Sequence, residues 1–71
     1  MEHIPVSSSN LSSVGYDVTS RTLEIAFHNG SLYQYSGVPL TVYQGLISAG
    51  SHGQYFDQYI KKAGYPYRRI R

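Results

Sequence analysis

The residues of this chain that could do chemistry are few and scattered. There are three histidines, His3, His28 and His52, and no cysteine. Because protein zinc sites usually draw on Cys and His at close spacing, we expect no bound metal, and no motif indicates another cofactor. Ser51 and His52 are neighbours, but a serine nucleophile needs a base within hydrogen-bonding reach and a third group to orient that base. We therefore predict no catalytic residues and no enzyme.

A stronger chemical signal is the positive charge at the C-terminal end. Residues 1–60 contain one arginine against four acids, whereas residues 61–71 contain five cations and no acid, and the whole chain carries +2. Two tyrosines are interleaved with these cations, and proteins that bind single-stranded nucleic acid combine cations with aromatic faces. The candidate nucleic-acid-binding residues are therefore Lys61, Lys62, Tyr65, Tyr67, Arg68, Arg69 and Arg71. The alternative is that the cations only complement the end of a helix dipole and aid solubility.

Length and composition limit the class of protein. A chain of 71 residues with 41% hydrophobic residues suits one small folded domain, residues 1–71. No run approaches the length of a membrane span, and residues 1–10 lack the apolar core of a signal peptide. With cysteine absent as well, we expect a cytoplasmic location and no membrane partner.

The N-terminal half has the period-two alternation of strands. Val14, Tyr16 and Val18 alternate with small or polar residues, which predicts a strand with these three side chains on its covered face. The same pattern recurs over residues 23–28 and 32–36. These segments predict a three-stranded antiparallel meander. Residues 1–10 form a loose lead-in, although Ile4 and Val6 suit an additional edge strand. The Ser-rich stretch of residues 7–13 is predicted to be a turn or part of this lead-in.

The register of the hairpin at Asn29-Gly30 decides where two tyrosines point. A two-residue loop would place Tyr33 and Tyr35 on the face away from Ile25, whereas a three-residue loop with Gly30 left-handed would pair Ile25 with Tyr33. A slip of one residue moves every side chain to the other face. We favour the three-residue loop because it gathers the large apolar side chains on one side. Both tyrosines would then join the core, which removes them as a stacking platform.

Two short helices are predicted after the strands. Tyr43, Leu46 and Ile47 recur at helical spacing, although Gly45 weakens this helix. Ser51 suits the cap of a second helix, and Gly64 suits its end. Residues 65–71 then form an extended basic tail, because Pro66 disfavours helix. The fold class is α+β, with both helices packed on one face of the sheet and the other face open.

The order of these residues resembles the KTSC domain, a family named for the C-terminus of some lysyl-tRNA synthetases. The matching features are Gly15-Tyr16-Asp17, Arg21-Thr22-Leu23, Phe27, Gly30, Tyr33-Gln34-Tyr35, Val38-Pro39, Tyr43, Leu46, Ala49, Ser51, Gly53, Tyr55-Phe56, Ile60 and Tyr65-Pro66-Tyr67-Arg68. The resemblance implies a stand-alone bacterial or phage version of the domain. It brings a suggestion of RNA binding through the association with a synthetase.

The sequence leaves two classes of function open. One is a small interaction domain that binds a protein partner, or a second copy of itself, through the open face or an edge of its sheet. The other is binding of RNA or another nucleic acid through the basic C-terminal segment. The first is our primary expectation and the second the alternative.

Overall fold

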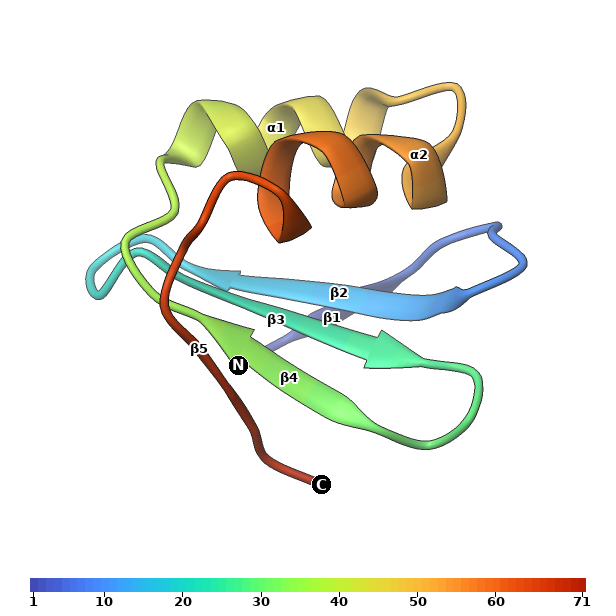
Figure 1. Cartoon of the computed structure of the whole chain (residues 1–71), viewed down its shortest axis with the longest axis horizontal. Coiled ribbons are helices and arrows are strands. Elements are labelled where there is room, and N and C mark those ends of the chain that lie inside the picture. The colour runs from blue at the N-terminus through green and yellow to red at the C-terminus, as the bar shows by residue number, and fades with distance from the viewer.

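The computed structural model describes all 71 residues and contains one antiparallel sheet covered on one face by helices (Figure 1). The strands follow one another in the order β1-β2-β3-β4-β5. Their bounds are β1 His3–Pro5, β2 Leu11–Asp17, β3 Thr22–Phe27, β4 Leu32–Tyr35 and β5 Tyr67–Arg69. The helices are α1 Leu40–Ser48 and α2 His52–Phe56, the latter continued by a π-helical turn, η1 Asp57–Lys61.

The α+β class is confirmed, and the sheet has five strands where three and an edge strand were predicted. The additional edge strand at the N-terminus is β1, in which Pro5 stands opposite Ser13. Proline is tolerated there because the outer edge needs no N–H donor. The segment predicted as an extended tail is β5, which pairs with β4 and closes the other edge of the sheet.

Two sequence predictions in the first hairpin need correction. The Ser-rich stretch is only partly a loop, because β2 begins at Leu11 and a bulge between Leu11 and Ser13 adjusts its register with β3. Val18 was predicted on the covered face, but it lies beyond β2 in the following turn and is exposed. The alternating sequence pattern continues to Val18, but β2 ends one residue earlier, at Asp17.

The register predicted for the second hairpin is confirmed. Ile25 pairs with Tyr33 and Leu23 with Tyr35. The Phe27 N–H donates to the Ser31 carbonyl at 2.9 Å, which encloses a three-residue loop, and Gly30 has φ +90°. A residue other than glycine would be strained in this left-handed conformation.

One continuous core fills the space between the sheet and the helices. The buried apolar residues are Leu11, Val14, Leu23, Ile25, Tyr35, Val38, Leu46, Phe56 and Ile60. They come from three strands, both helices, the π-helical turn η1 and the segment between β4 and α1. Neither helix has the length and apolar character needed to cross a membrane.

The helix signals read from sequence correspond to real contacts. The Gln54 N–H donates to the Ser51 hydroxyl oxygen at 3.3 Å, so Ser51 is the cap of α2 as predicted. Gly64 follows the last helical turn with φ +86°, the conformation of a glycine cap. Gly45 has a packing role, since a Cβ there would lie 2.7 Å from Cζ of Tyr55. Its missing side chain lets the Tyr55 ring lie against α1.

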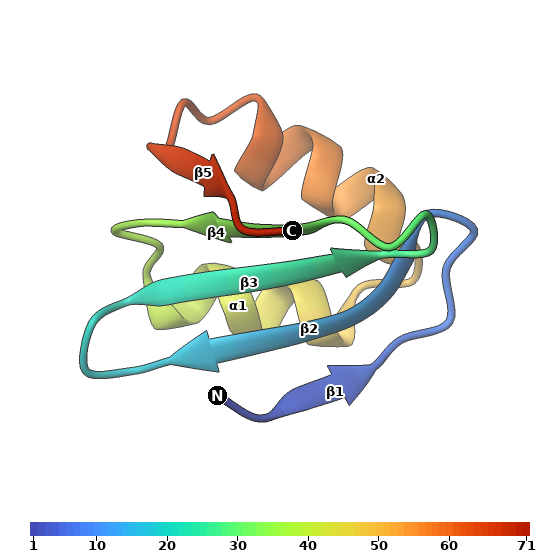
Figure 2. The ribbon, with the colours of Figure 1, turned by 90° about the horizontal axis from the view of Figure 1, so that it is seen from below.

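The open face of the sheet, which is turned towards the viewer in Figure 2, has one member of a row of polar side chains on each of the five strands. His3 Nε2 lies 2.6 Å from Glu24 Oε1, and the Gln34 amide donates to Glu24 Oε2 at 2.7 Å. Arg68 donates to Gln34 Oε1 at 3.4 Å, and Ser13 lies 2.9 Å from His3 Nδ1.

Gly15 is what allows this polar row to cross β2. A Cβ at Gly15 would lie 2.8 Å from the His3 ring. Because glycine leaves that space free, the His3 side chain reaches over β2 to Glu24 on β3. His3 is thus half-buried and paired, not solvent-exposed as its position near the chain end suggested.

Gly45→Ala is expected to destabilise the fold although alanine is the better helix former. The new methyl group meets the Tyr55 ring, and overpacking of this kind costs about 1–3 kcal/mol. Gly50→Ala is the matched control, because nothing lies within 4 Å of its Cβ position. Urea unfolding of both variants checks this, and equal stability of the two would contradict the packing role of Gly45.

The pairing of Glu24 is expected to make stability depend on pH. Burial alone raises the pKa of the Glu24 carboxyl, but hydrogen bonds from Gln34 and His3 and the charge of His3 outweigh it and hold the pKa below 4.5. A lowered pKa stabilises the fold above the unfolded-state value, and this contribution is lost as pH falls through the folded-state value. Glu24→Gln should cost about 1 kcal/mol at pH 7 and progressively less below pH ~4.5.

Denaturant unfolding of wild type and Glu24→Gln between pH 3 and 7 measures that difference. Glu2→Gln is the control, because the exposed Glu2 makes no side-chain hydrogen bond or ion pair. A stability difference between wild type and Glu24→Gln that stays constant over this range would contradict the role of the carboxylate.

Candidate functional site

Five aromatic rings gather on the helix-covered side of the sheet, towards its β5 edge. They belong to Phe27, Tyr33, Tyr35, Phe56 and Tyr67, and we call them the aromatic cluster. Tyr33 stacks on Tyr35 with centroids 6.5 Å apart, and the Tyr67 ring lies 5.9 Å from Tyr33 and 5.4 Å from Tyr35. Phe56 meets Phe27 and Tyr35 edge to face at 5.6 Å. Such offset and edge-on arrangements are the favoured ones for aromatic pairs.

Backbone pairing places the tyrosines of the cluster together. The three-residue hairpin loop turns Tyr33 and Tyr35 towards the helices, and the β4–β5 register sets Tyr67 opposite Tyr35. Tyr35 is buried and Tyr33 half-buried, whereas 64% of Tyr67 is exposed. The expectation that the hairpin register buries both tyrosines is therefore correct for Tyr35 and only partly correct for Tyr33.

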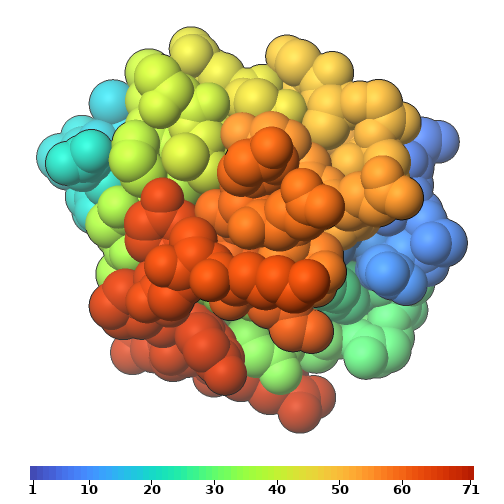
Figure 3. Space-filling model, turned by 45° about the horizontal axis from the view of Figure 1, so that its top comes forward, coloured from blue at the N-terminus to red at the C-terminus, as the bar shows by residue number.

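A cleft of about 470 Å³ opens over the cluster. Asn29, Ser31 and Lys61 complete its walls. In Figure 3 the C-terminal segment lies directly beside α2 and η1 on the surface, so the two sides of the cleft come from neighbouring segments. The volume falls within the ~300–1,000 Å³ of typical ligand sites, and the lining combines apolar rings with a few polar groups.

The phenol group of Tyr35 is a hydrogen-bonding group of the cleft. Burial, together with the charge that Tyr33 and Tyr67 would carry as phenolates, raises the pKa of Tyr35 to about 12. At neutral pH the Tyr35 hydroxyl therefore stays protonated and can both donate and accept. The nearby cations, Lys61 at the cleft wall and Arg69 opposite Tyr33 on β5, supply the charge.

The residues predicted as one nucleic-acid-binding segment are divided by the fold. Lys61 and Tyr67 line the cleft. Arg69 lies on the same side of the sheet, because it stands opposite Tyr33 as Tyr67 stands opposite Tyr35, but it does not line the cleft, and its Nε donates to the Arg71 carbonyl at 3.1 Å. Arg68 points to the opposite face, where it bonds Gln34.

The remaining predicted residues have local partners. Lys62 forms an exposed ion pair with Asp57 at 3.4 Å. Arg71 donates to the Gly30 carbonyl at 3.4 Å, next to the hairpin tip. Tyr65 is half-buried and packs against the core. These three residues do not line the cleft.

Sequence reasoning missed six residues that line the cleft: Phe27, Asn29, Ser31, Tyr33, Tyr35 and Phe56. Tyr33 and Tyr35 were assigned to the core and thereby removed as a stacking platform, but the half-buried Tyr33 lines the cleft together with Tyr35. The hairpin signal at Asn29-Gly30 located the turn but gave no sign that the turn forms a wall of a site. Asn29 Oδ1 accepts from both the N–H and the hydroxyl of Ser31, at 3.0 and 2.7 Å. Phe56 is buried and was predicted only as part of a core stripe.

The other polar groups that could do chemistry do not converge. His52 Nδ1 lies 2.8 Å from the Leu46 carbonyl oxygen, while Ser51 caps α2. No group of three or more His, Cys, Asp or Glu side chains has the arrangement of a metal site. The aromatic cleft is therefore the candidate site.

These features define a small α+β domain built on one meander sheet, with an aromatic cleft between the helix end and the last strand. The chain belongs to the KTSC domain family, whose model matches residues 7–65. The resemblance drawn from the ordered motifs is thus confirmed.

Related proteins fall into two groups. An uncharacterized protein of Stutzerimonas stutzeri is 43% identical over 70 residues, 99% of each chain. A lysine–tRNA ligase of Nostoc is 50% identical over 46 residues, which are 65% of this chain and 8% of the ligase. The crystal structure of a KTSC domain protein from Yersinia pestis has a TM-score of 0.90 and 45% identity, covering 99% of this chain and 97% of that one.

Ionisation of Tyr35 should be visible as a late step in an alkaline titration. Its pKa of about 12 exceeds the ordinary value of 10. The neutral phenol therefore contributes stability that is complete below pH 10 and lost as pH rises through 12. Phenolate absorbance of wild type should show a step near pH 12 that Tyr35→Phe lacks, and identical curves for the two proteins would contradict this environment.

Proposed function

We propose that the domain binds single-stranded RNA in the aromatic cleft and does not act as an enzyme. The observation that carries the proposal is the convergence of partly exposed tyrosine rings, Tyr33 and Tyr67, with two cations, Lys61 and Arg69. An unpaired base can lie on an aromatic ring, while a cation beside it meets the phosphate. Lys61 and both rings line the cleft, and Arg69 lies on the same face of the sheet, opposite Tyr33.

The shape of the cleft favours single strands over duplexes. Stacking on Tyr33 and Tyr67 requires a base that is free of its own partner, as in RNA loops and ends. The second feature in favour of RNA is kinship. Lysine–tRNA ligases act, as their name says, on tRNA, and one of them contains a segment 50% identical to this chain. Kinship alone does not transfer a function, so the cleft carries the argument.

A protein partner on the open face or at a sheet edge, the primary expectation from sequence, has weaker support. The open face carries a row of polar side chains from His3 to Arg68 whose hydrogen-bond partners lie within the domain itself. Both edge strands are three residues long. One of them contains Pro5 and the other two arginines, and proline, charge and short length are features that discourage strand addition.

RNA binding should depend on which face a residue occupies. We expect micromolar binding of a mixed single-stranded RNA pool at ~50 mM salt, weakened at ~200 mM because phosphate contacts release counterions. Tyr67→Ser should weaken binding about ten-fold through the loss of a stacked base. Lys61→Ser and Arg69→Ser should each weaken it and reduce its salt dependence. Fluorescence anisotropy of labelled RNA measures all four proteins.

Arg68→Ser is the matched control for Arg69→Ser. The two variants lose the same charge from adjacent residues of β5, but Arg68 lies on the opposite face. Equal weakening by both would show that only the net charge of the tail matters and would contradict a site in the cleft. Absence of binding at the lower salt would refute the proposal, provided that circular dichroism shows the domain folded.

A further inference from the structure

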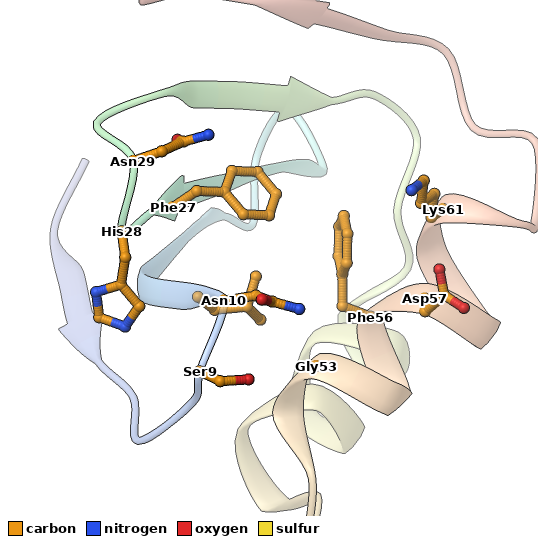
Figure 4. Close-up of a pocket in the computed structure, with 10 residues that line it drawn as sticks. Ser9, Asn10, Phe27, His28, Asn29, Gly53, Phe56, Asp57 and Lys61 are labelled. Carbon is orange, nitrogen blue, oxygen red and sulfur yellow. The ribbon is translucent and has the colours of Figure 1, made fainter.

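A second pocket, of about 420 Å³, adjoins the aromatic cleft. Four residues line both spaces: Phe27, Asn29, Phe56 and Lys61. The two therefore form one groove, with a tyrosine half and a polar half. Figure 4 shows the polar half, with Phe27 and Phe56 facing each other and Asp57 and Lys61 together on the helix side.

The polar half presents hydrogen-bonding groups that the fold itself does not use up. Asn29 Oδ1 already accepts two hydrogen bonds from Ser31, so its amide N–H groups remain for a ligand. The side chain of Asn10, whose amide extends towards the space between the two rings in Figure 4, makes no hydrogen bond within the protein. One carboxylate oxygen of Asp57 pairs with Lys62 at 3.4 Å in an exposed, weak contact. His28 instead turns away and bonds the Ser8 carbonyl at 2.8 Å.

The apolar part of this half suits a flat ring. Phe27 is half-buried and Phe56 is buried, and their centroids lie 5.6 Å apart at 72°. This spacing leaves no room for a ring between them, so a planar group would lie against the exposed part of Phe27. Asp57, Lys61 and the two asparagines line the same pocket and would be the hydrogen-bonding partners of its edge.

We propose that the polar half of the groove binds a guanine base, so that the RNA bound in the tyrosine half is selected for a neighbouring guanine. This inference rests on the proposed function. Guanine is the RNA base whose Watson–Crick edge offers two adjacent N–H donors beside a carbonyl acceptor. A carboxylate accepts two such donors at once, and the Lys61 ammonium or an asparagine amide donates to the carbonyl. Adenine, cytosine and uracil each offer a single donor position on that edge, which leaves the carboxylate with one hydrogen bond.

Four labelled pentanucleotides that differ only in the central base, UUGUU, UUAUU, UUCUU and UUUUU, test this selection. Anisotropy at ~50 mM salt should show UUGUU binding about ten-fold more tightly than the others, the usual discrimination of a good bidentate contact.

Asp57→Asn should abolish the preference, because an amide has one acceptor where the carboxylate has two. Lys62→Ser is the matched control and should keep the preference, because it removes the ion-pair partner of Asp57 and leaves the carboxylate.

The outcomes separate the two proposals. Equal binding of the four RNAs that is weakened by Tyr67→Ser would overturn guanine selection and leave RNA binding in place. Tighter binding of another base, or a guanine preference that survives Asp57→Asn, would also overturn the selection. If none of the pentanucleotides binds the folded domain, both proposals fail.

Discussion

The structure depends on the register of the β3–β4 hairpin, which is set by a three-residue loop with Gly30 in the left-handed conformation. Side chains alternate between the faces of a strand, so a shift of one residue would reverse every position of β4. With the observed register, Tyr33 and Tyr35 turn towards the helices and Gln34 turns away. The same choice creates the aromatic cluster on one face and the centre of the polar row on the other.

The last strand, β5, completes the candidate site. Pairing of β5 with β4 brings Tyr67 onto Tyr35 and separates two adjacent arginines onto opposite faces. Arg69 joins the aromatic side, whereas Arg68 ends the polar row that begins at His3. A run of positive charge in sequence thus becomes two different environments, because a strand distributes consecutive side chains alternately.

Much of the fold could be predicted from local rules. The alternation of Leu23, Ile25 and Phe27, the Asn29-Gly30 turn, the Ser51 cap and the Gly64 cap each act within a few residues, and the structure contains all of them. Val18 was misplaced because alternation does not show where a strand stops. Sequence reasoning assigned no packing role to Gly45 or Gly15. Each glycine leaves room for the side chain of a residue distant along the chain, Tyr55 for Gly45 and His3 for Gly15.

The sequence by itself determined the fold class and the family and favoured the correct one of two hairpin registers, because each follows from periodicity, turn chemistry or an ordered set of motifs. Tertiary structure alone decided which cations lie beside aromatic rings. Lys61 lies at the end of η1 and lines the cleft together with Phe27 and Asn29. These two residues belong to a hairpin more than 30 residues earlier in the chain. Contacts between such distant segments arise from strand pairing and core packing, and no local pattern records them.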